Sequence, residues 1–188
     1  MKRITLLLFI LICLAACVEN KCVIEGKVLD AGYEGEVVYL VPFKNPTRKT
    51  VDSTVIQNGN FRFNVKPKKQ NQVYIIRVKP VLRLKLQDII VIAEQGIIQV
   101  NFNQRSSSSG TPLNHTLQQW KERKRVIDST YYSLRRQYNK ETNEAEKRQL
   151  QTRLDSILQS YHVYADSLSG KNKDNAVGQL IGSLLENK

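Results

Sequence analysis

Residues 58–66 read Asn-Gly-Asn-Phe-Arg-Phe-Asn-Val-Lys, and this stretch identifies the first half of the chain as β-structure. Asn58-Gly59 is the dipeptide most typical of a tight hairpin turn. After it, Phe61 and Phe63 alternate with polar neighbours, so one face of the segment is apolar and the other is polar. This period of two predicts a half-buried strand.

Other short segments on both sides of this stretch have the same character. They are rich in valine and isoleucine and are separated by turn residues; they span 23–29, 35–41, 51–56, 73–79, 89–93 and 97–102. About seven short strands with turns between them predict an antiparallel β-sandwich or an open barrel over residues 22–104.

The strand pattern stops at a run of serines. Residues 105–111 contain four consecutive serines and a glycine. These residues bury little apolar surface, so we interpret 105–111 as a flexible Ser-rich linker. Thr111-Pro112 then predicts a helix start, with Thr111 at the N-cap and Pro112 at the first helical position.

From residue 113 onward, the apolar residues recur every three or four positions. The first stripe comprises Leu113, Leu117, Trp120, Ile127, Tyr131, Leu134 and Tyr138, with Lys124 as the polar exception. A polar turn follows at 139–143, and a second stripe runs from Leu150 to Leu168. Asn143 and Glu146 have the spacing of a helix cap. We therefore expect two long antiparallel helices, which end near Gly170.

A last apolar stripe, from Val177 to Leu185, predicts a short C-terminal helix capped by Asp174 or Asn175. The expected class is α+β, with the β-sandwich followed by a helical hairpin and this short helix over 112–188. The helical stripes have two interpretations. The helices pack on each other and on one face of the sheet, or part of a stripe is a surface for a partner.

The N-terminus has the features of a lipoprotein signal peptide. Lys2 and Arg3 precede an apolar run of ten residues, 4–13, and Leu14, Ala15 and Ala16 precede Cys17. The run is shorter than the roughly 20 residues that span a bilayer. We expect residues 1–16 to be removed, Cys17 to be acylated, and 17–21 to form a lipidated tether. The alternative is an ordinary signal peptide that happens to end at a cysteine.

The residue after the cysteine indicates which of the two membranes holds a bacterial lipoprotein. Val18 stands where an aspartate commonly retains lipoproteins in the inner membrane, so we expect the outer membrane of a bacterial cell envelope. The sequence leaves the periplasmic and surface faces open.

The chain is strongly basic. Its formal charge is +12, and Lys2 and Arg3 supply two of those charges, so residues 17–188 carry +10. An exported protein does not routinely meet nucleic acid, which leaves anionic lipid, lipopolysaccharide phosphates or acidic glycans as partners. The candidate anion-binding residues are Lys121, Arg123, Lys124, Arg125, Arg135 and Arg136. The alternative is that these side chains only solvate the helices.

No catalytic, metal or cofactor site is predicted. Without Cys13 and with Cys17 capped by lipid, only Cys22 remains, and we expect it to be a small residue at the start of the first strand. His115 and His162 each lack a second ligand at helical spacing. Asp52-Ser53 has no base at a suggestive spacing. We therefore expect a protein that is not an enzyme and holds no metal or cofactor.

Several short motifs occur in a recognisable order. They are Ile24-Glu25-Gly26, Val38-Tyr39-Leu40, Val51-Asp52-Ser53-Thr54, Asn58-Gly59-Asn60-Phe61-Arg62-Phe63 and Gly110-Thr111-Pro112-Leu113-Asn114. From residue 22 to about 185, the chain resembles the uncharacterised β-rich domain at the N-terminus of many thiol:disulfide interchange lipoproteins from Bacteroidota.

In those longer proteins, a segment like 172–178 leads into a thioredoxin-like domain with a Cys-x-x-Cys pair. This chain ends at Lys188, so the family's catalytic cysteines have no counterpart here. The resemblance implies the fold and the envelope setting, and it supplies no ligand.

Three functions are open at this point. The first is a lipid-anchored accessory or binding module of the cell envelope without catalytic activity. The second is a non-catalytic partner of a separate thioredoxin-like thiol:disulfide oxidoreductase. The third is a glycan-binding module that uses exposed aromatic side chains such as Tyr33, Tyr74 or Trp120.

Overall fold

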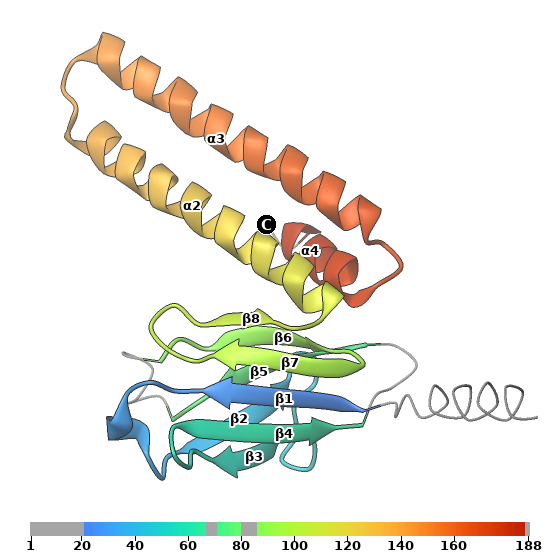
Figure 1. Cartoon of the computed structure of the whole chain (residues 1–188). Helices are drawn as coiled ribbons and strands as arrows, with labels where there is room; N and C mark the ends of the chain where they lie inside the picture. Colours follow the sequence, from blue (N-terminus) through green and yellow to red (C-terminus); the bar gives the residue numbers. More distant parts are fainter. Residues whose placement is uncertain (1–20, 67–70, 80–85, 187–188) are drawn as a thin grey trace, which may run out of the picture.

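The structure is a computed structural model that describes residues 21–66, 71–79 and 86–186. The predicted signal peptide, Cys17 and the residues up to 20 lie outside the described residues. In the described part, eight strands are followed by three helices, which confirms the α+β class (Figure 1). The strands are β1 (Cys22–Lys27), β2 (Val37–Pro42), β3 (Asp52–Val55), β4 (Asn60–Val65), β5 (Gln72–Arg77), β6 (Ile89–Ala93), β7 (Gly96–Asn101) and β8 (Ser107–Ser109). A short 3-10 helix, η1 (Ala31–Tyr33), follows β1.

The strands form two four-stranded sheets that pack as a sandwich. Their orders are β4-β1-β7-β8 and β3-β2-β5-β6. The predicted antiparallel arrangement holds for every pair in the described residues except one, because β1 and β7 run parallel with Ile24 opposite Ile98. Between these two strands the chain visits the second sheet twice, so local alternation in the sequence does not reveal their pairing.

The predicted turn at Asn58-Gly59 is present. Both residues have positive φ, 51° and 69°, a conformation that asparagine and glycine adopt most readily. Gln57 and Asn60 form an isolated antiparallel bridge around the turn. β3 and β4 belong to different sheets, so the turn passes the chain across the sandwich.

The main hydrophobic core lies between the two sheets. Phe61 packs edge-on against Phe63 and Phe102, with ring centroids 6.0 and 5.8 Å away. A Cβ atom on Gly26 would lie 1.9 Å from the Phe61 ring, which is why the first strand has a glycine at this position. Cys22 is buried at the start of β1, as expected.

The helices begin and end close to the predicted positions. They are α2 (Pro112–Lys140), α3 (Glu144–Lys171) and α4 (Ala176–Glu186). The side chain of Asn143 caps α3 by accepting from the backbone N–H groups of Ala145 and Glu146, at 2.9 and 3.3 Å. Asn175 caps α4 in the same way through the N–H of Val177, at 2.9 Å. The predicted helical hairpin of α2 and α3 is confirmed.

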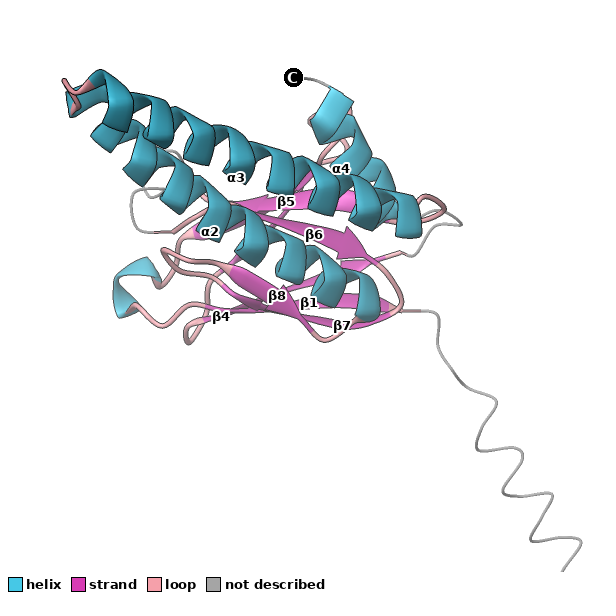
Figure 2. Cartoon of the chain, turned by 90° about the horizontal axis from the view of Figure 1, so that it is seen from above, coloured by secondary structure: helices cyan, strands magenta, loops and turns pink. Residues whose placement is uncertain are grey.

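A second hydrophobic core joins the helices to the sandwich. On β6, Val91 faces the other sheet, whereas Ile92 is buried among helical side chains such as Leu117 and Leu180. β6 is therefore buried on both faces, which accounts for its apolar sequence Ile-Ile-Val-Ile-Ala. Figure 2 shows the three helices lying across β5, β6 and β8.

The serine run is not a flexible linker, which corrects the prediction for 105–111. Ser107–Ser109 form β8, which pairs antiparallel with β7, and Ser108 is buried. Serine side chains carry no apolar signal, so the sequence pattern does not reveal this strand although its partner β7 is the strand just before it. Within the described ranges, no helix combines the length and apolarity that are needed to cross a bilayer.

Candidate functional site

The N-terminus of α2 is docked on the free edge of β6. The Asn114 side chain accepts a hydrogen bond from the backbone N–H of Ile92 at 3.0 Å and donates one to the Ile92 carbonyl at 2.7 Å. A side-chain amide thus makes the two bonds that a neighbouring strand would make. Asn114 is fully buried, so water cannot reach this part of the strand edge. The side chain supplies the hydrogen bonds that water would otherwise make with the Ile92 backbone.

Glu94, at the end of β6, caps the same helix. Its Oε1 atom accepts from the backbone N–H of Leu113 at 2.8 Å and from that of Asn114 at 3.1 Å. A carboxylate at a helix N-terminus also interacts favourably with the helix dipole. Thr111 occupies the predicted N-cap position, but its hydroxyl accepts from the Asn114 amide at 2.9 Å and does not cap the helix backbone.

Further along α2, two side chains cover the edge of the first sheet as well. Gln118 accepts from the N–H of Ser108 at 3.1 Å. Lys121 donates to the Ile90 carbonyl at 3.4 Å and to the Ser108 hydroxyl at 3.3 Å. Asn114, Gln118 and Lys121 share one helix face, and together they shield edge groups of both sheets from other strands.

Lys121 belongs to the predicted anion-binding set, but the structure directs its ammonium group onto the sheet edges. Burial lowers the pKa of this side chain from its usual 10.5 to about 8. The protein's own carbonyl and hydroxyl oxygens take up its hydrogen bonds, so we leave Lys121 out of the anion-binding surface proposed below.

The other five predicted anion-binding residues are spread around α2. Each turn of the helix covers 3.6 residues, so consecutive positions point in different directions. Their placements are Arg123 over the Tyr164 ring, Lys124 paired with Asp128, Arg125 paired with Glu122, Arg135 over the Tyr138 ring, and Arg136 exposed. The structure does not bring the predicted set together at one site.

A cleft of about 470 Å³ lies between the start of β6 and α2. Three residues of the predicted set line it, Lys121, Lys124 and Arg125. Arg105 lines it as well, and the carboxylates of Asp88, Glu122 and Asp128 in the same lining offset most of this positive charge. The mixed charge makes this cleft a poor site for an anion.

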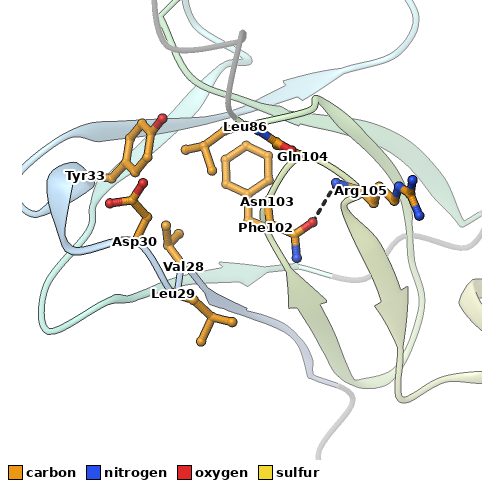
Figure 3. A pocket seen from close by; sticks show the side chains of 9 residues that line it. All are labelled: Val28, Leu29, Asp30, Tyr33, Leu86, Phe102, Asn103, Gln104 and Arg105. Atoms are coloured by element: carbon orange, nitrogen blue, oxygen red, sulfur yellow. Dashed lines mark hydrogen bonds between the residues drawn. The ribbon is translucent and has the colours of Figure 1, made fainter.

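A cavity of about 610 Å³ lies at the end of the sandwich opposite the start of β1 (Figure 3). Its polar groups are engaged in local turns. Asp30 accepts from the N–H of Gly32 at 2.9 Å, and Asn103 accepts from the N–H of Arg105 at 2.6 Å. In Figure 3 the Arg105 guanidinium points away from the cavity. Its described lining therefore does not pair a nucleophile with a base.

The two histidines lie apart from any ligand cluster. His115 contacts Gln119 on α2, and His162 lies beside the Tyr161 ring on α3. Among the described residues, no group of three histidine, cysteine or carboxylate side chains is placed to hold a metal ion.

The expectation that Tyr33, Tyr74 and Trp120 are exposed is wrong. Tyr33 and Trp120 are buried, and Tyr74 is half-buried with its hydroxyl bonded to Gln72. Tyr33 packs in the main core and Trp120 in the second core. The buried rings of Tyr33 and Trp120 offer no open face for stacking on a sugar.

The fold and the docking site define a two-sheet β-sandwich module in which the helix that follows covers one edge of each sheet, at β6 and β8. The chain belongs to the family described as a domain of unknown function, DUF4369, which matches residues 22–117. The matched region therefore includes all eight described strands and the docked first turns of α2, with Glu94 and Asn114. No curated protein and no solved structure matches the chain.

Asn114 is expected to be essential to stability. We expect Asn114→Ala to lower the free energy of unfolding by about 2–4 kcal/mol, because it leaves buried backbone groups of Ile92 without partners. Urea unfolding followed by circular dichroism measures the change. His115→Ala, at the exposed neighbouring position, should stay within about 0.5 kcal/mol. Equal effects of the two substitutions would contradict the docking role of Asn114.

Lys121 should give the protein an unusual pH dependence. Its folded pKa of about 8 lies below the usual 10.5, so above pH 8 the folded chain releases a proton that the unfolded chain keeps. The stability of the wild type relative to Lys121→Met should therefore rise with pH, by at most about 1.4 kcal/mol per unit. Urea unfolding of both proteins at pH 7, 8 and 9 measures this difference.

The comparison stops at pH 9 because the Cys22 thiol also changes the stability at higher pH. Burial raises its pKa from the usual 9.0 to about 11 in the folded chain. Ionisation of that thiol in the unfolded state removes stability above pH 9, but it acts equally on both proteins. A stability difference that stays flat from pH 7 to 9 would contradict the burial of the Lys121 ammonium group.

Proposed function

We propose that this chain is a lipid-anchored accessory or binding module of the bacterial cell envelope, without catalytic activity of its own. The observation that carries the proposal is the Leu14-Ala15-Ala16-Cys17 box after a short apolar run. Small residues give a peptidase access to the bond before Cys17, whose thiol then bears a diacylglyceryl group. Two or more acyl chains anchor a protein stably, whereas one chain gives only marginal binding.

The distance between the box and the fold supports this arrangement. β1 begins at Cys22, five residues after Cys17. Even a fully extended chain of this length spans at most about 18 Å. An acylated Cys17 would therefore hold the sandwich close to the membrane surface. Val18 favours the outer membrane, and the proposal covers both its periplasmic and its surface face.

A role in binding is favoured by how the polar groups of the described residues are used. The buried polar side chains are used at the contact between α2 and the sheets. Asn114, Glu94 and Ser108 join α2 to the strands, and the Thr111 hydroxyl accepts from the Asn114 amide. The Asp30 carboxylate at the cavity of Figure 3 caps η1. These groups have structural partners, and this supports a module that acts by its surface.

The second candidate is a non-catalytic partner of a separate thioredoxin-like oxidoreductase. It is supported by the order of motifs that resembles the N-terminal domain of Bacteroidota thiol:disulfide interchange lipoproteins. Two of these motifs have structural roles in this chain. Gly110–Asn114 docks α2, and a Cβ atom on Gly178 would lie 2.1 Å from the Asn172 carbonyl. These two motifs have a role in the fold, so they carry no evidence of a reaction performed by the described residues.

The anchor is tested by replacing one atom. We expect Cys17→Ser to move the protein from the membrane fraction to the soluble or unprocessed fraction, because a hydroxyl does not accept the thioether-linked lipid. Mass spectrometry of the native product should show an N-terminus at Cys17 with fatty adducts. Cys22→Ser, a matched cysteine that is buried in β1, should stay in the membrane fraction. Equal partitioning of wild type and Cys17→Ser would refute the anchor.

The partner hypothesis is tested by crosslinking in isolated membranes. If the chain serves a thiol:disulfide pathway, pull-down after crosslinking should enrich a protein with a Cys-x-x-Cys pair. The enrichment should survive Cys22→Ser, because the buried thiol is not expected to take part. Recovery of no such protein would remove this candidate and leave the anchored binding module.

A further inference from the structure

The loops at one end of the sandwich come together near the start of β1. Cys22 lies opposite Val65 at the end of β4 and Gly96 at the start of β7. In the second sheet, Pro42 at the end of β2 lies opposite Tyr74 in β5. The chain therefore leaves β2 and β4 at the same end at which β1 begins. Figures 1 and 2 both place the turn between α3 and α4 at this end as well.

These segments carry exposed basic side chains. We call this set the basic end; it consists of Lys21, Lys44, Arg48, Lys49, Lys66, Lys171 and Lys173, all exposed. The described acidic residues in the same segments are Asp52, Asp174 and Glu94. Glu94 is buried and used as the cap of α2, so it adds little negative charge to the surface.

The opposite end of the sandwich has a different charge. There, Asp30, Glu34 and Glu36 follow β1, and Asp88 precedes β6. The described basic residues at that end are Lys27, Arg77, Lys79 and Arg105, so they match the four acidic residues in number. Two of them form ion pairs, Arg77 with Asp88 at 3.3 Å and Lys79 with Glu36 at 3.6 Å. Positive charge is thus concentrated toward the N-terminal end of β1.

We propose that the basic end docks on the anionic headgroups of the membrane that holds the lipid anchor. This inference rests on the proposed anchoring at Cys17, which would keep the start of β1, where the basic end lies, within about 18 Å of the lipid anchor. The Debye length is about 8 Å at physiological salt, so a basic side chain attracts the anionic headgroups strongly only when it lies at the membrane surface. A lysine or arginine at an anionic surface strengthens partitioning about fivefold.

Docking of this kind also gives the molecule an orientation. The strands then run away from the membrane, with the cavity of Figure 3 at their far end. The closed end of the helical hairpin lies on the side away from the start of β1 (Figure 1). The hairpin would project into the surrounding compartment and stay clear of the lipid.

The experiment uses the chain from Val18 to Lys188, which has no acylation site. Both hydrophobic cores consist of residues between 22 and 185, so this chain retains them. Sedimentation measures its binding to vesicles of phosphatidylglycerol and of neutral phosphatidylcholine. One variant replaces four residues of the basic end by glutamine: Lys44, Arg48, Lys49 and Lys66. The matched control replaces four exposed basic residues on the hairpin by glutamine as well: Arg136, Lys140, Arg148 and Arg153.

We expect the unmodified chain to bind phosphatidylglycerol vesicles in preference to phosphatidylcholine, with binding that weakens as salt is raised. The basic-end variant should lose at least about tenfold in its partition coefficient, and the hairpin control less than about twofold. Thermal melting confirms that both variants are folded. The proposal is overturned by a lack of preference for the anionic vesicles, or by losses in the two variants that differ by less than fivefold.

The two proposals can fail separately. The vesicle experiment does not involve Cys17, so its failure leaves the anchor standing. A native product without fatty adducts would refute the anchor whatever the vesicles show.

Discussion

The contact between the Asn114 amide and the backbone of Ile92 determines how the two halves of this protein fit together. Without it, β6 would end the second sheet with open hydrogen-bonding groups, a position that invites pairing with other chains. Glu94 adds the helix cap that Thr111 does not provide, so α2 starts at a fixed point. From that point, Leu117 and Trp120 pack with Ile92 on the outer face of β6. The direction of α2 then sets the direction of α3 and the position of α4.

Much of the fold could be predicted because local patterns specify local structure. The alternation around Phe61 and Phe63, the Asn58-Gly59 turn and the Asn143 cap all appear where the sequence indicates them. β6 has the predicted bounds, 89–93. The parallel pairing of β1 with β7 and the strand at Ser107–Ser109 could not be predicted in this way. The β1–β7 pairing joins segments that are far apart in sequence. The strand at Ser107–Ser109 pairs with nearby β7, but a serine gives no sign of the partner that buries it.

The candidate site was harder to predict than the fold. Basic residues that are adjacent in the sequence point in different directions on a helix, so Lys121 faces the sheet while Arg123 lies over Tyr164. Similarly, the sequence is compatible with a binding surface that includes aromatic residues such as Trp120, but in the structure Trp120 packs in the second core. The sequence does hold a signal for Asn114 that the predictions did not use, because it is a polar residue in the first turn of a helix with an apolar stripe. Its partners on β6 are visible only in three dimensions.

The position of β1 has a mechanical consequence. This strand is an inner strand, bonded to β4 on one side and to β7 on the other. A pull on its first residue, directed away from the sheet along the strand, loads both ladders in shear, so that many hydrogen bonds must yield together. A terminal strand at a sheet edge would instead peel off one bond at a time. A protein held at its N-terminus by this strand should resist stretching of its tether better than one held by an edge strand.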